Sequence, residues 1–248
     1  MSIRTLLNEI VHCPHARFCL QNPDTEHPCR EIVLSQGSIN LDQYQVPEPW
    51  SGKIEQAPIL FLSSNPSISF SEDYPICSWS DDDVDDYFNY RFGGGRKEWI
   101  VNGKKSLQKD GTYSSSVNFW AAIRQRAMEL LRRDVHPGTD YALTEIVHCK
   151  SCEEIGVKQA QNKCVEAYLL RILELAGAKV VVVLGSPARK AIQSQFNISA
   201  EISVSEPIMI GSRERFFAFL PHPNAFAPKS FAKCFQEHEL EKLRAFLH

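Results

Sequence analysis

The chain contains no long hydrophobic run and no marked excess of charge of either sign. No stretch of its 248 residues is long and apolar enough to cross a bilayer, so we expect no membrane partner. The opening residues MSIRTLLNE lack the apolar core of a secretion signal and favour a cytoplasmic protein. With a net charge of −3, the charge balance neither supports nor excludes a nucleic acid as partner.

A disulfide framework is not expected either, although the sequence contains eight cysteines. In a cytosolic chain, thiols serve metal binding, catalysis or plain burial. Most of them fall into an early and a late group, namely Cys13, Cys19 and Cys29, then Cys149, Cys152 and Cys164. Cys77 and Cys234 stand alone and are interpreted as ordinary residues without a metal role.

Short apolar runs alternate with helical patterns along the chain. Buried strands are expected at residues 59–62, 141–147, 179–184 and 216–220, and a shorter one at 32–34. Helices are expected at residues 3–12, 165–175 and 237–246, and after the serines at 114–116. Because helices separate the strands, the pattern predicts an α/β fold with a mainly parallel sheet and helices on both faces.

The four apolar strands end in small or polar residues. The first breaks into Ser63-Ser64-Asn65-Pro66-Ser67, a run of turn formers, and the others lead to Glu145, Gly185 and His222. In parallel sheets the carboxyl ends of the strands border one crevice, where ligands bind. We therefore expect Asn65 and His222 to converge across that crevice.

Residues 71–116 are the least regular part of the chain and are interpreted as an insertion. They contain an acidic block at 81–86, which we interpret as a solvated loop. A flank of aromatic and basic residues between Tyr87 and Trp99 suits the stacking and phosphate contacts of single-stranded nucleic acid. Packing of these aromatics on the domain explains the pattern equally well.

An ordered set of motifs resembles the uracil-DNA glycosylase superfamily. The turn Ser63-Ser64-Asn65-Pro66-Ser67 resembles the Gly-x-Asn-Pro-Gly first motif of the mismatch-specific and single-strand-selective branches. Pro221-His222-Pro223-Asn224 resembles the His-Pro-Ser second motif, and Asn118-Phe119-Trp120 is similar to a shortened Asn-x-Phe-Trp. Between residues 143 and 192, the order of strand, Cys149, fourteen spacer residues, Cys164, helix and KVVVVLG resembles the iron–sulfur branch. The matches cover about half of the chain.

The resemblance implies a three-layer α/β/α sandwich with a short, mainly parallel central sheet. We expect a single DNA glycosylase domain over residues 1–248, with a Cys-bearing N-terminal helix and loop at 1–30 and the insertion at 71–116. The implied partner is DNA, and we expect the protein to act as a monomer. The implied reaction flips a nucleotide out of the duplex and hydrolyses its N-glycosidic bond.

The resemblance also implies roles for single residues at the reacting centre. Asn65 would orient the attacking water, and His222 would stabilise the charge that builds on the departing base. Ser64, Phe70 and Glu145 are the candidates for binding the base, with Phe70 stacking on it.

Contacts with the duplex are expected just beyond His222. Asn224 and Phe226 would enter the DNA, with Phe226 as an apolar wedge, and Lys229 would meet a phosphate. The alternative for Phe70 and Phe226 is packing in the core.

The cysteines of the iron–sulfur branch bind a [4Fe–4S] cluster, which needs four thiolates. Cys149 and Cys164 match its late pair by position, and Cys13, followed by Pro14, matches the second member of its early pair. The first member is missing because position 10 is Ile, so Cys19 or Cys29 must supply the fourth ligand. The spacing of Cys149 and Cys152 leaves a zinc site or a redox pair as the alternative.

Glu145 departs from the iron–sulfur branch, in which the corresponding strand carries an Asn that reads the uracil edge. A carboxylate accepts hydrogen bonds from an exocyclic amine such as cytosine N4, and a protonated carboxyl also donates to N3. We therefore expect a modified cytosine as substrate, which suits defence against phage with modified DNA. The alternatives are a uracil-DNA glycosylase of base-excision repair, a module that binds modified DNA without cutting it, and a zinc-stapled interaction protein.

Overall fold

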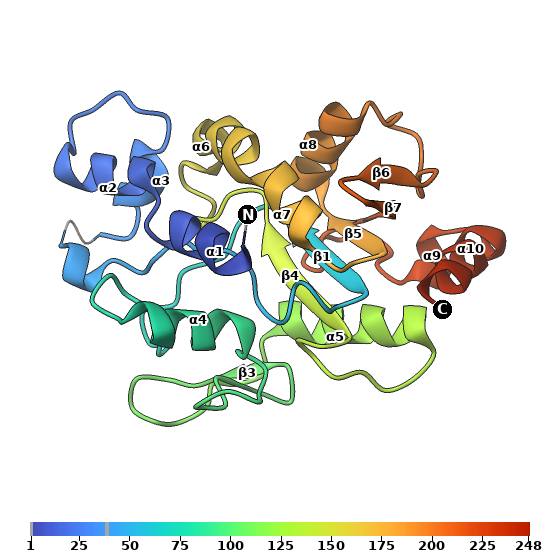
Figure 1. The fold of residues 1–248 in the computed structure, drawn as a ribbon, viewed down its shortest axis with the longest axis horizontal. Coiled ribbons are helices and arrows are strands. Elements are labelled where there is room, and N and C mark those ends of the chain that lie inside the picture. Colours follow the sequence, from blue (N-terminus) through green and yellow to red (C-terminus); the bar gives the residue numbers. More distant parts are fainter. Residues whose placement is uncertain (1, 38–39) are drawn as a thin grey trace.

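The computed structural model describes residues 2–37 and 40–248, and its centre is a five-stranded sheet (Figure 1). Along the sheet the strands are β4 (Tyr141–Glu145), β1 (Ile59–Ser63), β5 (Val180–Leu184), β7 (Arg213–Leu220) and β6 (Ile208–Ile210). The first four are parallel, as predicted, whereas β6 pairs antiparallel with β7 at one edge. In this register Ser63 lies opposite Glu145, and Leu184 lies opposite Leu220.

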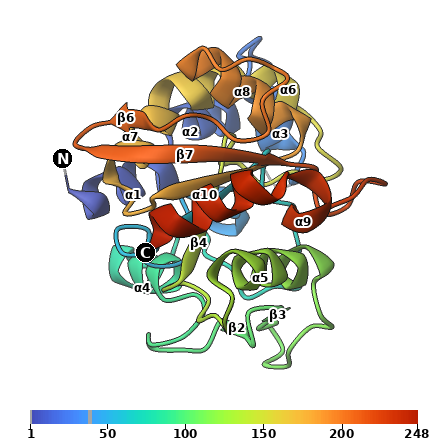
Figure 2. The same cartoon turned by 90° about the vertical axis from the view of Figure 1, so that its right-hand side faces the viewer.

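Helices cover both faces of the sheet, which confirms the predicted α/β sandwich (Figures 1 and 2). One face carries α5 (Asn118–Leu131), α9 (Phe231–Cys234) and α10 (Glu237–Leu247). The other carries α1 (Ile3–Val11), α6 (Val157–Cys164), the π-helix at Val165–Leu169, α7 (Leu170–Leu175) and α8 (Ser186–Phe196). No helix among the described residues is long and apolar enough to cross a membrane.

The central strands β1 and β5 are buried along their whole length because each face of the sheet has its own core. Along β1, Leu60 and Leu62 pack toward the α1–α8 face, whereas Ile59 and Phe61 pack toward the α5–α10 face. Successive side chains on a strand point to opposite faces, so a strand buried on both sides needs an uninterrupted apolar run.

Two local expectations were wrong. Residues 30–34 form a helix, α3 (Arg30–Leu34), and not a strand. The acidic block begins the helix α4 (Asp81–Asn89), where the Ser80 hydroxyl accepts a hydrogen bond from the Asp83 backbone N–H at 3.2 Å. Three aspartates in a first helical turn are favoured by the helix dipole, so a run of acidic residues can start a helix.

The remaining short elements do not belong to the five-stranded sheet. They are α2 (Pro14–Gln21), a 3₁₀ turn at Leu41–Gln43, β2 (Ile100–Val101) and β3 (Lys105–Ser106). The helical pattern predicted at 165–175 begins earlier, with α6, and passes through the π-helix that directly follows Cys164. The α2 and α3 helices lie on the side of α6 away from α10 (Figure 1).

Candidate active site

A cavity of about 430 Å³ opens at the carboxyl edge of the parallel strands. Its lining includes Asn65 after β1, Glu145 at the end of β4, and His222 after β7. Ser64 and Asn224 line it as well. The cavity thus brings together five of the residues that were predicted for catalysis, base binding or DNA contact.

Asn65 is held by its amide group at the edge of this cavity. Its Nδ2 donates to the Ser151 hydroxyl at 2.8 Å and to the backbone carbonyl of Pro66 at 3.1 Å. Because the amide hydrogens are engaged by the protein, Asn65 meets a ligand as an acceptor through Oδ1.

Ser151 is in turn fixed to the turn that carries Asn65. A parallel bridge joins Ser67 and Ser151, with the Ser151 N–H donating to the Pro66 carbonyl at 3.2 Å and the Ile68 N–H donating to the Ser151 carbonyl at 3.1 Å. The loop after β4 and the turn after β1 therefore form one unit, two residues beyond Cys149.

His222 is set up as a neutral hydrogen-bond donor. The backbone N–H of Asn224 donates to Nδ1 at 3.2 Å, which leaves the ring proton on Nε2. Burial lowers the pKa of His222, and Lys229 lowers it further while Glu154 opposes the shift. The ring stacks on Phe119 at 5.5 Å between centroids, which fixes its plane.

Gly185 makes room for this histidine. A Cβ on Gly185 would lie 3.2 Å from the Cβ of His222, and the backbone of Gly185 has a φ of +81°, which side chains disfavour. Its N–H donates to the Leu220 carbonyl at 2.9 Å, so the β5 and β7 ends are tied together just below His222.

Glu145 is a buried carboxyl at the inner end of the cavity. Its side chain is opposite Ser63, whose hydroxyl donates to Oε1 at 3.3 Å, and the residue is 5% exposed. Oε2 is buried and has no hydrogen-bonding partner among the described residues. Burial raises the pKa of Glu145 well above its ordinary value, and the nearby Glu48 carboxylate raises it further.

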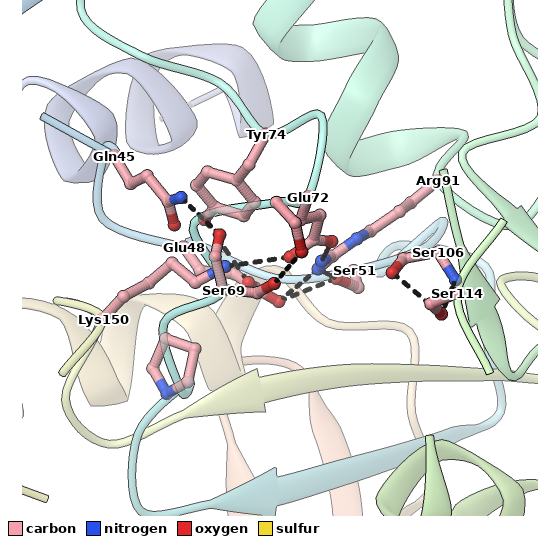
Figure 3. Close-up of polar contacts among 12 residues, drawn as sticks. Gln45, Glu48, Ser51, Ser69, Glu72, Tyr74, Arg91, Ser106, Ser114 and Lys150 are labelled. Carbon is pink, nitrogen blue, oxygen red and sulfur yellow. Dashed lines mark hydrogen bonds and ion pairs between the residues drawn. The ribbon is translucent and has the colours of Figure 1, made fainter. Parts of the chain in front are cut away.

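A buried ion-pair network lies beside Glu145 and also borders the cavity (Figure 3). Arg91 pairs with Glu48 and with Glu72, each at 2.7 Å, and Lys150 pairs with Glu72 at 3.2 Å. Two cations already balance two carboxylates in this network. A third negative charge on Glu145 would be uncompensated, which agrees in direction with the raised pKa of this carboxyl.

Sequence reasoning missed this network. Arg91 belongs to the flank that was weighed as a nucleic-acid surface, yet Arg91 is 2% exposed, and Tyr87, Phe88 and Trp99 are buried around it or near it. Packing on the domain is the correct alternative for these side chains. The available signal was Lys150, a lysine in the loop after a buried strand and between Cys149 and Cys152.

The predicted aromatic and basic contacts lie outside the cavity. Phe70 is 60% exposed and Phe226 is fully exposed, so core packing is wrong for both. Within the described part of the chain, the aromatic side chains that line the cavity are Phe119 and Trp120 and not Phe70. Lys229 is half-buried and acts on the His222 ring through its charge.

Four buried free thiols gather beneath the loop after β4, from Cys13, Cys29, Cys149 and Cys164. Burial raises the pKa of Cys149, and its neighbours Cys164, Cys13 and Cys29 raise it further. Cys29 is affected in the same way, first by burial and then by Cys164 and Cys13. Cys19 is buried against His27, with Sγ at 3.6 Å from Nδ1.

Hydrogen-bond donors already surround these sulfurs. The Tyr168 hydroxyl donates to the Cys13 sulfur at 3.5 Å, and the Tyr44 hydroxyl donates to the Cys149 sulfur at 3.7 Å. The backbone of His148 lowers the pKa of Cys164 by a hydrogen bond, against the larger effect of burial. These donors lie close to the sulfurs, while burial holds the pKa values of Cys149 and Cys164 above the ordinary value.

Across the described residues, no three His, Cys, Asp or Glu side chains are grouped closely enough to hold a metal ion, so this grouping supports neither zinc nor a cluster. Four buried thiols are nevertheless the type of donor set that a [4Fe–4S] cluster uses. Cys152, the other member of the predicted redox pair, is half-buried and free.

In comparisons with known proteins, no family model matches the chain and no curated protein is significantly similar. The resemblance to the glycosylase superfamily therefore rests on the motifs and on the side chains described above.

Proposed function

We propose that the protein is a monofunctional DNA glycosylase that removes a modified pyrimidine, a modified cytosine, and leaves an abasic site. One observation carries the proposal: an acceptor amide on Asn65, an imidazole donor on His222 and the buried carboxyl of Glu145, whose pKa burial raises, meet in one cavity. Each group matches a different need of N-glycosidic bond hydrolysis.

The sugar side of the reaction needs a positioned water. Cleavage passes through an oxocarbenium-like sugar, so a weak nucleophile suffices if it is held at the right place. Oδ1 of Asn65 accepts a hydrogen bond from that water, while its amide group stays fixed by Ser151. His222 donates from Nε2 to the base oxygen on which negative charge develops.

The base side of the reaction distinguishes cytosine from uracil. Uracil departs as an anion, whereas a cytosine departs as a neutral molecule only when N3 receives a proton. Glu145 would supply that proton as a general acid, and its carboxylate would then accept from N4. Water adds its hydroxyl to the sugar carbon and its remaining proton restores Glu145 through solvent.

A modification on the base is needed because removal of ordinary cytosine would destroy the host's own genome. The cavity has a volume of about 430 Å³, which leaves room for a substituent beside a pyrimidine ring. We therefore propose a bulky substituent on the base and a role in defence against phage with modified DNA.

A base-release panel tests the proposal. Duplexes with one uracil, cytosine, 5-hydroxymethylcytosine or hexosylated 5-hydroxymethylcytosine are incubated with the protein, and abasic sites are scored by alkaline cleavage. Release is expected from a modified cytosine. Glu145→Gln keeps the size of the side chain but removes the acid, so we expect release to fall by about 100- to 10,000-fold.

Uracil remains the second candidate, for a specific reason. A neutral carboxyl both donates and accepts, so Glu145 also matches the N3 and O4 edge of uracil. Efficient uracil release by the wild type, not improved by Glu145→Asn, would favour base-excision repair and overturn the cytosine assignment. Binding without any release, unchanged by Asn65→Ala, would favour the non-catalytic module.

DNA contacts are proposed at the exposed loop after β7. Phe226 is a fully exposed large apolar side chain, which suits a wedge between base pairs, and Asn224 lies between it and the cavity. Lys229 supplies the adjacent positive charge for a phosphate. The protein is proposed to act as a monomer in the cytoplasm.

The cofactor is proposed to be a [4Fe–4S] cluster on Cys13, Cys29, Cys149 and Cys164. When bound, the cluster would hold the N-terminal helices against the loop after β4 and would take part in no redox step. We expect Cys29→Ser to lose the broad visible absorption and the about four irons per chain of a cluster, because a ligand is gone. Cys19→Ser is expected to keep both.

Metal analysis and visible spectra of the purified variants check this assignment. Cys234→Ser is the control, since Cys234 belongs to α9 on the opposite face of the sheet and is half-buried. Loss of colour in Cys19→Ser with colour retained in Cys29→Ser would reverse the assignment, and a colourless wild type that contains zinc would remove the cluster.

A further inference from the structure

One wall of the cavity is built almost wholly from hydroxyl and amide side chains. These residues are Ser69, Ser71, Ser106, Gln108, Ser114 and Ser115. All of them follow the turn that carries Asn65, and most belong to the irregular segment 71–116. They are not needed for water positioning or for proton transfer to a base, so the proposed reaction leaves them without a role.

The hydroxyl wall is pre-arranged by its own hydrogen bonds. Ser106 is buried, and its N–H donates to the Ser114 hydroxyl at 3.0 Å. Gln108 donates through Nε2 to the Ser106 hydroxyl at 2.8 Å, and the Ser114 hydroxyl donates to the Ser115 carbonyl at 2.8 Å. Figure 3 shows Ser106 and Ser114 on one side of the ion-pair network and Ser69 on the other.

The ion-pair network adds fixed charges to this wall. It lies between Ser69 on one side and Ser106 and Ser114 on the other (Figure 3). Glu72 presents carboxylate acceptors, while Arg91 and Lys150 present donors, and all three side chains are buried and border the same cavity. A substituent that meets this wall must both donate and accept hydrogen bonds at several points. An alkyl group would displace water from these polar side chains without offering hydrogen bonds in return, which is unfavourable.

The charges around the cavity further restrict which substituent can bind. Besides Glu72, the cavity carries Glu48 at its base and Glu153 and Glu154 at its rim, so an anionic substituent would be repelled. The cations Arg91 and Lys150 disfavour a positively charged one. A neutral group with several hydroxyls fits, because each hydroxyl both donates and accepts.

We infer that the hydroxyl wall is a subsite for a neutral sugar carried by the target base, of the hexose type. This inference rests on the proposed glycosylase activity and names its substrate class. The base would lie between Asn65, Glu145 and His222, and the sugar would occupy the remaining volume along the wall. The segment 71–116 would then determine which modification is accepted.

The test compares two substrates that differ only in the sugar. Single-turnover release is measured on duplexes with one 5-hydroxymethylcytosine or one hexosylated 5-hydroxymethylcytosine, for the wild type, Ser114→Val and Gln108→Leu. Both variants are expected to lose about 10- to 100-fold on the sugar-bearing base, as expected for buried polar groups left unpaired, and less than about 3-fold on the hydroxymethyl base. Ser116→Val is the matched control, since Ser116 is exposed and lies outside the cavity lining of the described residues.

The possible outcomes distinguish a failure of the sugar subsite from a failure of the glycosylase proposal. An equal loss on both substrates would overturn the inference, because the wall would then serve only to hold the fold. A wild type that releases hydroxymethylcytosine but not the hexosylated base would also overturn it, while the glycosylase stands. No release from any duplex would remove the proposed function itself. Thermal melting of each variant shows that a loss of release is not a loss of folded protein.

Discussion

Asn65→Ala is expected to lower base release by about 100- to 1,000-fold while leaving DNA binding unchanged. The variant removes the acceptor that would hold the attacking water, and a single well-placed polar group at a reacting centre contributes about this much. Asn65 makes its hydrogen bonds to Ser151 and Pro66 through the amide alone, so the turn keeps its backbone bridge in the variant. Single-turnover release and fluorescence anisotropy on the same duplex separate the two effects.

Asn118→Ala is the matched control for this substitution. Asn118 is the first residue of α5, beside the cavity residues Val117 and Phe119, and it is exposed. Its variant is expected to release the base at the wild-type rate. Equal rates for Asn65→Ala and the wild type would assign the water to another residue and remove the reason for the glycosylase proposal.

Ser151 extends the same prediction to the loop that follows the cysteines. Its hydroxyl accepts the shorter hydrogen bond of Asn65, so Ser151→Ala frees the amide without touching the acceptor Oδ1. We expect release to fall by about 10-fold, in line with the net 0.5–1.5 kcal/mol of a hydrogen bond, and Ser151→Thr to restore it. A loss confined to the rate, with unchanged DNA binding, distinguishes positioning from a defect in folding.

The sheet and the residues at its edge could be predicted because they leave local patterns. A strand buried on both faces needs an apolar run, and residues 179–184 and 216–220 contain such runs. The parallel arrangement then brings Asn65, Glu145 and His222 to one edge, whatever the loops do. The edge strand β6 was not predicted, because its three residues pair only with β7 and are partly exposed.

The ion-pair network could not be predicted, because its members are brought together only by the fold. Arg91 lies 43 residues from Glu48 and 19 from Glu72, and Lys150 is 78 residues from Glu72. Charged residues are mostly exposed, so sequence reasoning assigns each of them to the surface. The choice of the fourth cysteine ligand could not be predicted for a similar reason. Cys19 and Cys29 differ in how they pack in the fold, and no local sequence pattern distinguishes them.

Breaking that network is expected to have the largest effect on stability. Arg91→Met keeps much of the length of the side chain but leaves Glu48 and Glu72 with Lys150 as the remaining cation of the network. Loss of one partner from a buried ion pair costs about 3–5 kcal/mol, because the other charge stays buried without compensation. Urea unfolding at pH 7, followed by tryptophan fluorescence, measures the free energy of unfolding.

Arg96→Met provides the comparison on the surface. Arg96 pairs with Asp83, and both side chains are about half exposed. Exposed pairs contribute about 0–1 kcal/mol, so this variant is expected to unfold within that margin of the wild type. If Arg91→Met also lowers the free energy of unfolding by only about 0–1 kcal/mol, water must reach the network and solvate the carboxylates that have lost their cation.

The dependence on pH shows whether charge or packing causes the loss. Burial opposes ionisation of Glu72, but Lys150 and Arg91 outweigh it and lower its pKa from 4.5 to about 2. A carboxyl with a lowered pKa stabilises the fold above its unfolded pKa, and this stabilisation is lost as the pH falls through the folded value. In Arg91→Met the carboxylates take up protons more readily, so the penalty is expected to shrink below about pH 4.5. A penalty that stays constant from pH 7 down to pH 3 would assign the loss to packing of the arginine against Tyr74, Tyr87 and Trp120.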